Sequence, residues 1–303
     1  MTKVLAFLRL SRPYFLGGGL LLYALGALIA RYQGYGIDFR LYWLGQAFVS
    51  ALQLMVHYLN EYWDVETDRL NQNRTPFSGG SGLLADGTIS KDTVFTAAVA
   101  CLAVASGAAI WLILEYRVGP AAWALMALTF LGAYSYSSPP FKLVNTGLGE
   151  VTASITVAGL VPAMGHVLQA GQPSFLVVLA TAPLVVYHFT MLLAFEFPDF
   201  LADEAAGKTT LLVRLGRRRG VALHNAALVL AMALGVVVSF VGLPVQVALA
   251  VVISSPLVLL QIVNFRRMQR GDPVNYLRLT LLALIIFALT SYFAAFNFWV
   301  LSS

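Results

Sequence analysis

Residues 175–195 read FLVVLATAPLVVYHFTMLLAF, and this stretch decides the fold because it contains no Asp, Glu, Lys or Arg. A helix needs roughly 20 apolar residues to cross the hydrocarbon core of a bilayer, so the stretch predicts a transmembrane helix. The charged sequence EFPDFLAD follows immediately at residues 196–203. We therefore expect this helix to end in a polar layer at one face of a membrane.

Eight similar stretches surround it, which gives nine predicted crossings. In chain order the nine are Tyr14–Ala30, Leu41–Leu59, Thr93–Leu114, Val118–Tyr136, Val151–Leu168, Phe175–Phe195, Val221–Val241, Val245–Val263 and Leu279–Leu301. They leave no room for a soluble domain between them. The sequence therefore predicts an all-α polytopic membrane protein, a single domain (1–303) made of nine transmembrane helices.

The composition agrees with this class of protein. Of the 303 residues, 59% are hydrophobic and 11% are charged, and the mean hydropathy is +0.79. A soluble domain carries about a quarter charged residues, so too few are present here to cover a water-facing surface. The one cysteine, Cys101, excludes an intramolecular disulfide and a metal site built from cysteines.

Lysines and arginines are distributed unevenly between the two sides that nine crossings define. Arg31, Arg40 and Arg117 lie on one side. The other side holds the remaining sixteen of the nineteen: Lys3, Arg9, Arg12, Arg69, Arg74, Lys91, Lys142, Lys208, Arg214, Arg217, Arg218, Arg219, Arg266, Arg267, Arg270 and Arg278. Basic residues favour cytoplasmic loops, so we expect the basic side to face the cytoplasm, across a plasma or inner membrane. The net charge of +5 is then a topology signal, and no nucleic-acid partner is expected.

The basic side also carries a regular acidic motif at the end of the second stretch. Residues 60–68 read NEYWDVETD, in which Asn60, Asp64 and Asp68 recur every four residues. At about 100° per residue, these three side chains fall within an arc of about 80° on a helix. Three oxygen donors therefore point in one direction.

A second acidic motif follows the sixth stretch. On a helix, Glu196, Asp199 and Asp203 fall within about 60°, although Pro198 is expected to perturb this turn. Asp199 lies 135 residues after Asp64, with four crossings between them, so both motifs return to the same face. This repetition predicts two parallel four-helix halves, roughly 10–150 and 151–270, followed by a ninth helix over 279–301.

Two facing sets of carboxylates repel each other unless a cation lies between them. Oxygen ligands without cysteine or paired histidine favour Mg²⁺, which uses a few carboxylates together with substrate phosphates. Ionisable groups at membrane depth are usually functional. The predicted metal ligands are Asn60, Asp64, Asp68, Glu196, Asp199 and Asp203.

Together with two further segments, these motifs resemble the UbiA superfamily of intramembrane prenyltransferases over nearly the whole chain. The further segments are the linker RTPFSGGSG at 74–82 and the sequence YSSPPFK at 136–142, which precedes GLGE at 147–150. The linker and the tail AGKTTLLVRLG at 206–216 are more similar to the menaquinone branch than to the 4-hydroxybenzoate branch. That branch tends to carry Asn-Asn before the second motif, where this chain has Phe195-Glu196.

The resemblance implies transfer of a polyprenyl group from a prenyl diphosphate to an aromatic acceptor, a quinone precursor such as 1,4-dihydroxy-2-naphthoate. It implies two Mg²⁺ ions, one at each motif, and an isoprenoid tail lying among the helices near membrane lipid. The catalytic residues it implies are Asp64, Asp68, Asp199, Asp203, Lys142 and Tyr136. The residues it implies for diphosphate binding are Asn60, Arg69, Arg74, Lys208 and Arg12. Tyr136 would stabilise an allylic cation through its ring face.

Two alternatives stay open from the sequence. The same fold could act on another acceptor (4-hydroxybenzoate, homogentisate, a tetrapyrrole or a glycerol phosphate) or could cyclise a terpene without any acceptor. A cation-coupled transporter is the rival class, but transporters place their charged residues near the bilayer midplane. Here the acidic residues gather at one face. The base that removes the final proton is Asp68 or a carboxylate on the substrate.

Overall fold

The computed structural model describes residues 3–303, and side chains from residue 5 onward, so the side chain of Lys3 lies outside the described part. Within this part every regular element is helical. The α-helices are α1 (Lys3–Leu10), α2 (Pro13–Tyr32), α3 (Phe39–Leu70), α4 (Lys91–Leu114), α5 (Pro120–Ser137), α6 (Gly149–Ile155), α7 (Val161–Ala170), α8 (Phe175–Ala205), α9 (Leu211–Val241), α10 (Val245–Ile253), α11 (Ser255–Gln269) and α12 (Tyr276–Leu301). The prediction of an all-α protein is confirmed.

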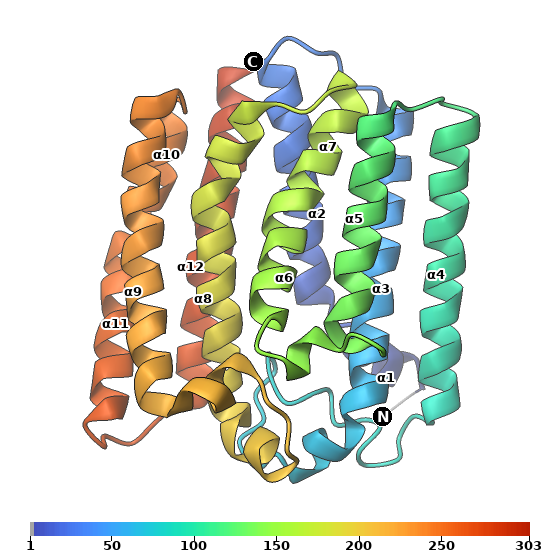
Figure 1. Ribbon diagram of the computed structural model, residues 1–303. Helices are drawn as coiled ribbons and strands as arrows, with labels where there is room; N and C mark the ends of the chain where they lie inside the picture. Colours follow the sequence, from blue (N-terminus) through green and yellow to red (C-terminus); the bar gives the residue numbers. More distant parts are fainter. Residues whose placement is uncertain (1–2) are drawn as a thin grey trace.

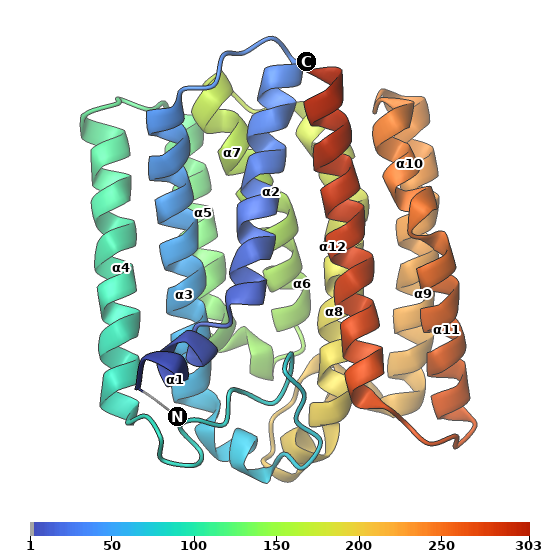
Figure 2. The same cartoon turned by 180° about the vertical axis from the view of Figure 1, so that it is seen from behind.

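The long helices stand side by side as one bundle (Figures 1 and 2). The lower end in Figure 1 carries α1, the loop 71–90 and the turn between α8 and α9, and we call it the charged end. The opposite end carries the loop 33–38 and the last turn of α12. Both predicted acidic motifs lie at the charged end, because α3 and α8 both finish there.

Among residues 3–303, seven helical segments are long and apolar enough to cross a membrane. They are Pro13–Tyr32, Lys91–Leu114, Gly149–Ala170, Phe175–Ala205, Leu211–Val241, Val245–Gln269 and Tyr276–Leu301. The other two predicted crossings lie in α3 and α5, which run beside these segments but are less apolar. In α3, polar side chains face protein partners: Gln53 Nε2 donates to the carbonyl of Phe15 at 2.7 Å, and His57 Nδ1 lies 3.3 Å from the carbonyl of Ser11.

Helices α3 and α8 are longer than a bilayer core requires. They contain 32 and 31 residues, so each is about 47 Å long, against a hydrocarbon core of about 30 Å. Each therefore continues past its apolar stretch as a polar helical extension. Pro198 does not interrupt α8, which runs on to Ala205. These two extensions position the site.

Two of the predicted crossings are broken in their middle. The crossing predicted over Val151–Leu168 consists of α6, a π-helical turn at Thr156–Leu160, and α7. The one predicted over Val245–Val263 consists of α10 and α11, which meet at Ser254. A π-helical turn often marks a functional position, and Thr156 and Val157 line the cavity described next.

Candidate active site

A cavity of about 450 Å³ runs from the charged end into the bundle, as its lining residues show. Its walls come from α2, α3, α5, the α6–α7 segment, α8 and α12. Its polar end is lined by Arg12, Asn60, Asp64, Asp68, Asn71, Tyr136, Glu150, Glu196, Asp199, Asp203 and Lys208. Its apolar part is lined by side chains such as Leu22, Leu52, Val161, Met191 and Phe287. Such a cavity can hold a ligand with a charged head and an apolar body.

From α3, the three residues of the first motif all line this cavity, as their four-residue spacing predicts. The side chains of Asp64 and Asp68 are buried. Burial, followed by the charges of Glu61 and Asp64, raises the pKa of Asp68 to about 8. Ionised carboxylates crowded in this way favour a cation beside them.

From α8, all three residues of the second motif line the same cavity. Asp199 accepts hydrogen bonds from Asn71 Nδ2 at 2.7 Å and from the backbone N–H of Gly79 at 3.1 Å. Glu196 accepts from the backbone N–H of Leu212 at 2.9 Å, in the first turn of α9. The two motifs therefore share one compartment, and the loop after α3 reaches across to the second motif.

Lys208 joins the two motifs directly. Its Nζ lies 2.7 Å from Oδ2 of Asp64 and 3.8 Å from Oδ1 of Asp203. Burial lowers the pKa of Lys208, but the charges of Asp64 and Asp203 outweigh burial, and the net shift is upward. A permanently charged ammonium group therefore lies at the polar end of the cavity.

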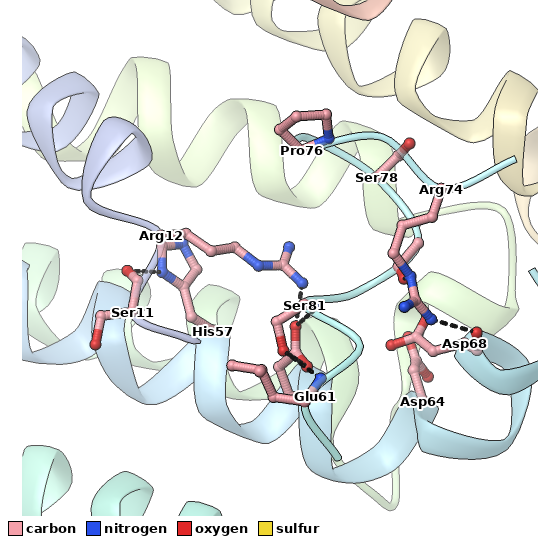
Figure 3. Close-up of polar contacts among 12 residues, drawn as sticks. Ser11, Arg12, His57, Glu61, Asp64, Asp68, Arg74, Pro76, Ser78 and Ser81 are labelled. Atoms are coloured by element: carbon pink, nitrogen blue, oxygen red, sulfur yellow. Dashed lines mark hydrogen bonds and ion pairs between the residues drawn. The ribbon is translucent and has the colours of Figure 1, made fainter. Parts of the chain in front are cut away.

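Glu61 is a site residue that the sequence reasoning missed. It is buried, and its carboxylate forms an ion pair with Arg12 and accepts from the N–H and the hydroxyl of Ser81 at 2.6 and 2.7 Å (Figure 3). Arg12 itself adopts a left-handed conformation with φ of 46°, which is uncommon for a residue with a side chain. Glu61 thus ties α3 to the α1–α2 junction and to the loop 71–90, and both of its oxygens are occupied.

Arg74 folds the loop after α3. Its Nη2 donates to the backbone carbonyl of Asp68 at 2.6 Å (Figure 3). Its Nε donates to the backbone carbonyl of Gly79, also at 2.6 Å. Gly80, with φ of 68°, brings the loop so close to Asp68 that a Cβ would lie 1.9 Å from Oδ2. Arg74 is not among the residues that line the cavity.

Two other residues predicted for the site lie outside the cavity lining. Arg69 is exposed and pairs with Glu66 at 3.2 Å. The Nζ of Lys142 lies 5.9 Å from the centre of the Trp63 ring. Both remain at the charged end, but neither lines the cavity in this conformation.

Aromatic rings line the cavity just inside its polar end. Tyr136 is one of them, as predicted. Phe77 stacks on Phe195 with ring centres 6.1 Å apart, and Phe15 packs against Phe195 at 6.0 Å. These three phenylalanines line the cavity as well. Ring faces in a dry cavity stabilise a positive charge, so this layer could shield a carbocation.

The polar end offers oxygen donors suited to a hard cation. Within residues 3–303, no three His, Cys, Asp or Glu side chains converge closely enough to form a complete metal cage. Mg²⁺ does not require one, because it keeps several waters and is held by one or two carboxylates plus substrate phosphates. The carboxylates of Asp64, Asp68, Asp199 and Asp203 fit that pattern of ligands.

Comparison with known proteins agrees with this geometry. The pattern of the UbiA prenyltransferase family matches residues 19–285. The homogentisate phytyltransferase of Synechocystis is 28% identical to this chain over 249 residues, which is 77% of each protein. The digeranylgeranylglyceryl phosphate synthase of Ignicoccus hospitalis is 29% identical over 199 residues, which covers 62% of this chain and 60% of that protein. The structure of a UbiA homologue from Archaeoglobus fulgidus bound to GPP and Mg²⁺ has a TM-score of 0.64 at 17% identity, over 97% of this chain and 99% of the other. With two acidic motifs in one cavity and a family match over most of its length, the chain belongs to the UbiA prenyltransferase family and is a prenyltransferase.

Proposed function

We propose that the protein transfers a polyprenyl group from a prenyl diphosphate to a hydroxylated aromatic acceptor, in a Mg²⁺-dependent reaction. One observation carries the proposal: the carboxylates of α3 and α8 line a single cavity whose inner part is apolar. A diphosphate head suits the first region and an isoprenoid tail the second. The homogentisate phytyltransferase relative supports an aromatic acceptor, and the sequence motifs favour 1,4-dihydroxy-2-naphthoate.

In this proposal, the carboxylates of the two motifs would hold Mg²⁺, which would supply Lewis-acid chemistry to neutralise the departing diphosphate. Asn60, Asp64 and Asp68 would hold one ion, and Asp199 and Asp203, with Glu196, the other. Arg12 and Lys208 line the same end and would bind the diphosphate oxygens with their N–H groups. Arg69, Arg74 and Lys142 lie farther out and would reach a diphosphate only after the loops rearrange.

The remaining groups act on the isoprenoid and on the acceptor. Tyr136 and the three phenylalanine rings that line the same cavity keep water from the carbon that loses the diphosphate, and their ring faces stabilise its positive charge. The acceptor ring then forms a bond to this carbon and loses a proton to Asp68 or to its own carboxylate. Excluding water favours transfer over hydrolysis.

We also propose that nine segments cross the membrane, with the charged end in the cytoplasm and the two halves related as a repeat. The positions of α1 and α12 support an odd number of membrane crossings, because α1 lies at the charged end and α12 finishes at the opposite end (Figure 2). Arg31, Arg40 and Arg117 lie at the sparsely basic end. Replacing Cys101 by Ser and introducing Asp86→Cys or Arg117→Cys gives single thiols at the two ends. A membrane-impermeant maleimide added to intact cells should label the Arg117→Cys variant but not the Asp86→Cys variant.

The activity is tested with purified protein in nanodiscs, geranylgeranyl diphosphate and Mg²⁺. The acceptors are homogentisate, 1,4-dihydroxy-2-naphthoate, 4-hydroxybenzoate and geranylgeranylglyceryl phosphate, with products identified by mass spectrometry. Prenylation of a dihydroxylated aromatic ring, lost on chelation of Mg²⁺, is the expected result. A terpene hydrocarbon formed without acceptor, or transfer only to the glyceryl phosphate, would overturn the aromatic assignment.

A further inference from the structure

A histidine lies in the apolar part of the cavity, away from the charged residues. His188 on α8 is buried and lines the cavity. It lies eleven residues before Asp199, a rise of about 16 Å along the helix. Met191, Leu192 and Phe195 line the cavity between the two. A polar ring here has no part in binding a diphosphate.

The hydrogen bonds around His188 determine which ring nitrogen carries the proton. The hydroxyl of Ser154 donates to the carbonyl of Glu150 at 2.6 Å, because a carbonyl oxygen can only accept. The Ser154 oxygen is therefore an acceptor toward His188 Nδ1, which lies 3.1 Å away. Nδ1 must then carry the hydrogen. In the neutral ring, Nε2 is left with a free lone pair.

Among the side chains that the structure describes, the one hydrogen bond of the His188 ring is that of Nδ1, so this lone pair has no partner there. The edge-on ring of Phe287, 5.0 Å away between centres, fixes the plane of the imidazole. Two more buried groups of the same cavity, the hydroxyls of Thr129 and Ser291, also lack a hydrogen-bond partner among the described residues. An isoprenoid tail has no polar atoms and cannot satisfy any of them. The wall of the inner cavity at His188 therefore suits a second ligand that carries a hydrogen-bond donor and that lies beside the isoprenoid tail.

We propose that Nε2 of His188 accepts a hydrogen bond from a ring hydroxyl of the acceptor, which makes His188 a specificity-determining residue. The inference rests on the proposed function. The reacting carbon of the acceptor must approach the carbon that bears the diphosphate, just inside the polar end. In a dihydroxylated ring, the hydroxyl that does not face the diphosphate then points inward, past Phe195 and Met191, toward His188. An acceptor without that hydroxyl leaves Nε2 without a hydrogen-bond partner. Such an acceptor should therefore bind and react less well at this site.

The kinetic test compares two probes that differ by one hydroxyl, 1,4-dihydroxy-2-naphthoate and 1-hydroxy-2-naphthoate, each with geranylgeranyl diphosphate and Mg²⁺. His188→Leu should raise the KM for the dihydroxy probe about tenfold, the loss of one neutral hydrogen bond. It should leave the KM for geranylgeranyl diphosphate within about twofold. His188→Gln, whose amide can donate to Ser154 and accept from the probe, should recover most of the loss. His166→Gln is the control, because His166 pairs with Gln33 and does not line the cavity.

A spectroscopic test is independent of turnover. The chain has four histidines, so ¹⁵N-histidine labelling gives few signals, and His188→Leu identifies that of His188. Nε2 should be unprotonated in the free protein and should shift when the dihydroxy probe is added, but not with the monohydroxy probe. A protonated Nε2, or no shift with the dihydroxy probe, would overturn the inference.

The two tests separate this inference from the proposed function. If the wild-type protein prenylates neither probe nor homogentisate, the aromatic function fails, and the spectra alone decide on His188. If transfer occurs but His188→Leu changes only the KM for geranylgeranyl diphosphate, His188 contacts the tail and the inference is wrong. Equal loss with both probes would also contradict it.

Discussion

The Nζ of Lys208 lies 2.7 Å from Oδ2 of Asp64, and this ion pair joins the turn after α8 to the end of α3. The contact connects two acidic motifs that are 135 residues apart in sequence. Because Asp64 and Asp203 outweigh burial and raise the pKa of Lys208, the ammonium group stays charged up to the ordinary lysine value, and on the basic side its contribution to stability is lost only as the pH rises through the raised pKa. On the acid side the contribution falls as the carboxylates are protonated, and burial raises the pKa of Asp203 to about 6.

Replacing Lys208 by Met should destabilise the protein, because it leaves Asp64 buried without its partner. Removing one member of a buried ion pair costs about 3–5 kcal/mol, which corresponds to a decrease in Tm of roughly 5–15 °C. The decrease in Tm is measured by thermal unfolding in detergent. Lys91→Met is the control, since Lys91 only stacks over Tyr62 at an exposed position. Equal Tm values for the two variants would contradict the bridging role.

Asp64→Asn and Asp199→Asn should each lower the rate of diphosphate release by about 10²–10³-fold, the usual cost of losing an electrostatic contact to developing charge. Release is followed with a coupled diphosphate assay at saturating Mg²⁺. Glu66→Gln is a matched control from the same end of α3, because Glu66 is exposed and pairs only with Arg69. Normal turnover in both aspartate variants would rule out the two-motif mechanism.

Glu61→Gln should weaken binding of the prenyl diphosphate without abolishing catalysis. The variant loses the ion pair that holds Arg12 against the cavity, and a charge-assisted hydrogen bond of this kind is worth about 1.5–3 kcal/mol. The KM for the diphosphate should rise at least about tenfold, with kcat changed less. Ser81→Ala removes the hydroxyl that donates to Glu61 and accepts from the backbone N–H of Leu83, but it leaves the Arg12–Glu61 ion pair in place and should have a smaller effect. An unchanged KM in Glu61→Gln would show that Arg12 does not bind the diphosphate.

Gly80→Ala should damage the site more than Gly87→Ala does. Both glycines have positive φ, 68° and 75°, but a Cβ at Gly80 would collide with Asp68, whereas Gly87 has nothing within 4 Å. In both variants an alanine must adopt a positive φ, which costs about 1–2 kcal/mol in conformational free energy. Only Gly80→Ala should also raise the Mg²⁺ concentration needed for half-maximal activity. The comparison requires Tm and a Mg²⁺ titration for each variant.

The sequence pattern predicted the helices well, and the spacing of the acidic residues predicted that both motifs are helical, but hydropathy did not predict where α3 and α8 end. The apolar stretch Phe175–Phe195 predicts where α8 begins, but the helix continues to Ala205. Charged residues lower the apolarity of a segment without preventing helix formation, so hydropathy underestimates the length of α8 and likewise of α3. The four-residue spacing of Asn60, Asp64 and Asp68 did predict their common direction, because it depends only on helix geometry.

Contacts between distant segments could not be derived from spacing. Lys208 was expected at the diphosphate, but its pairing with Asp64 depends on how α3 and α8 pack. No sequence pattern distinguishes Glu61 from the acidic residues near it. Its contacts with Ser81 and Arg12 become apparent only from the folded structure. Arg74 was expected to face substrate, and in the structure it binds backbone carbonyls instead.

The opposite positions of α1 and of the last turn of α12 (Figures 1 and 2) limit how two copies could be linked. In the proposed topology of nine crossings, a direct head-to-tail fusion would insert the second copy upside down, with its active site in the wrong compartment. One extra apolar helix of about 20 residues between the copies would restore the orientation. In the same topology, soluble reporters attached to the two termini would lie in different aqueous phases.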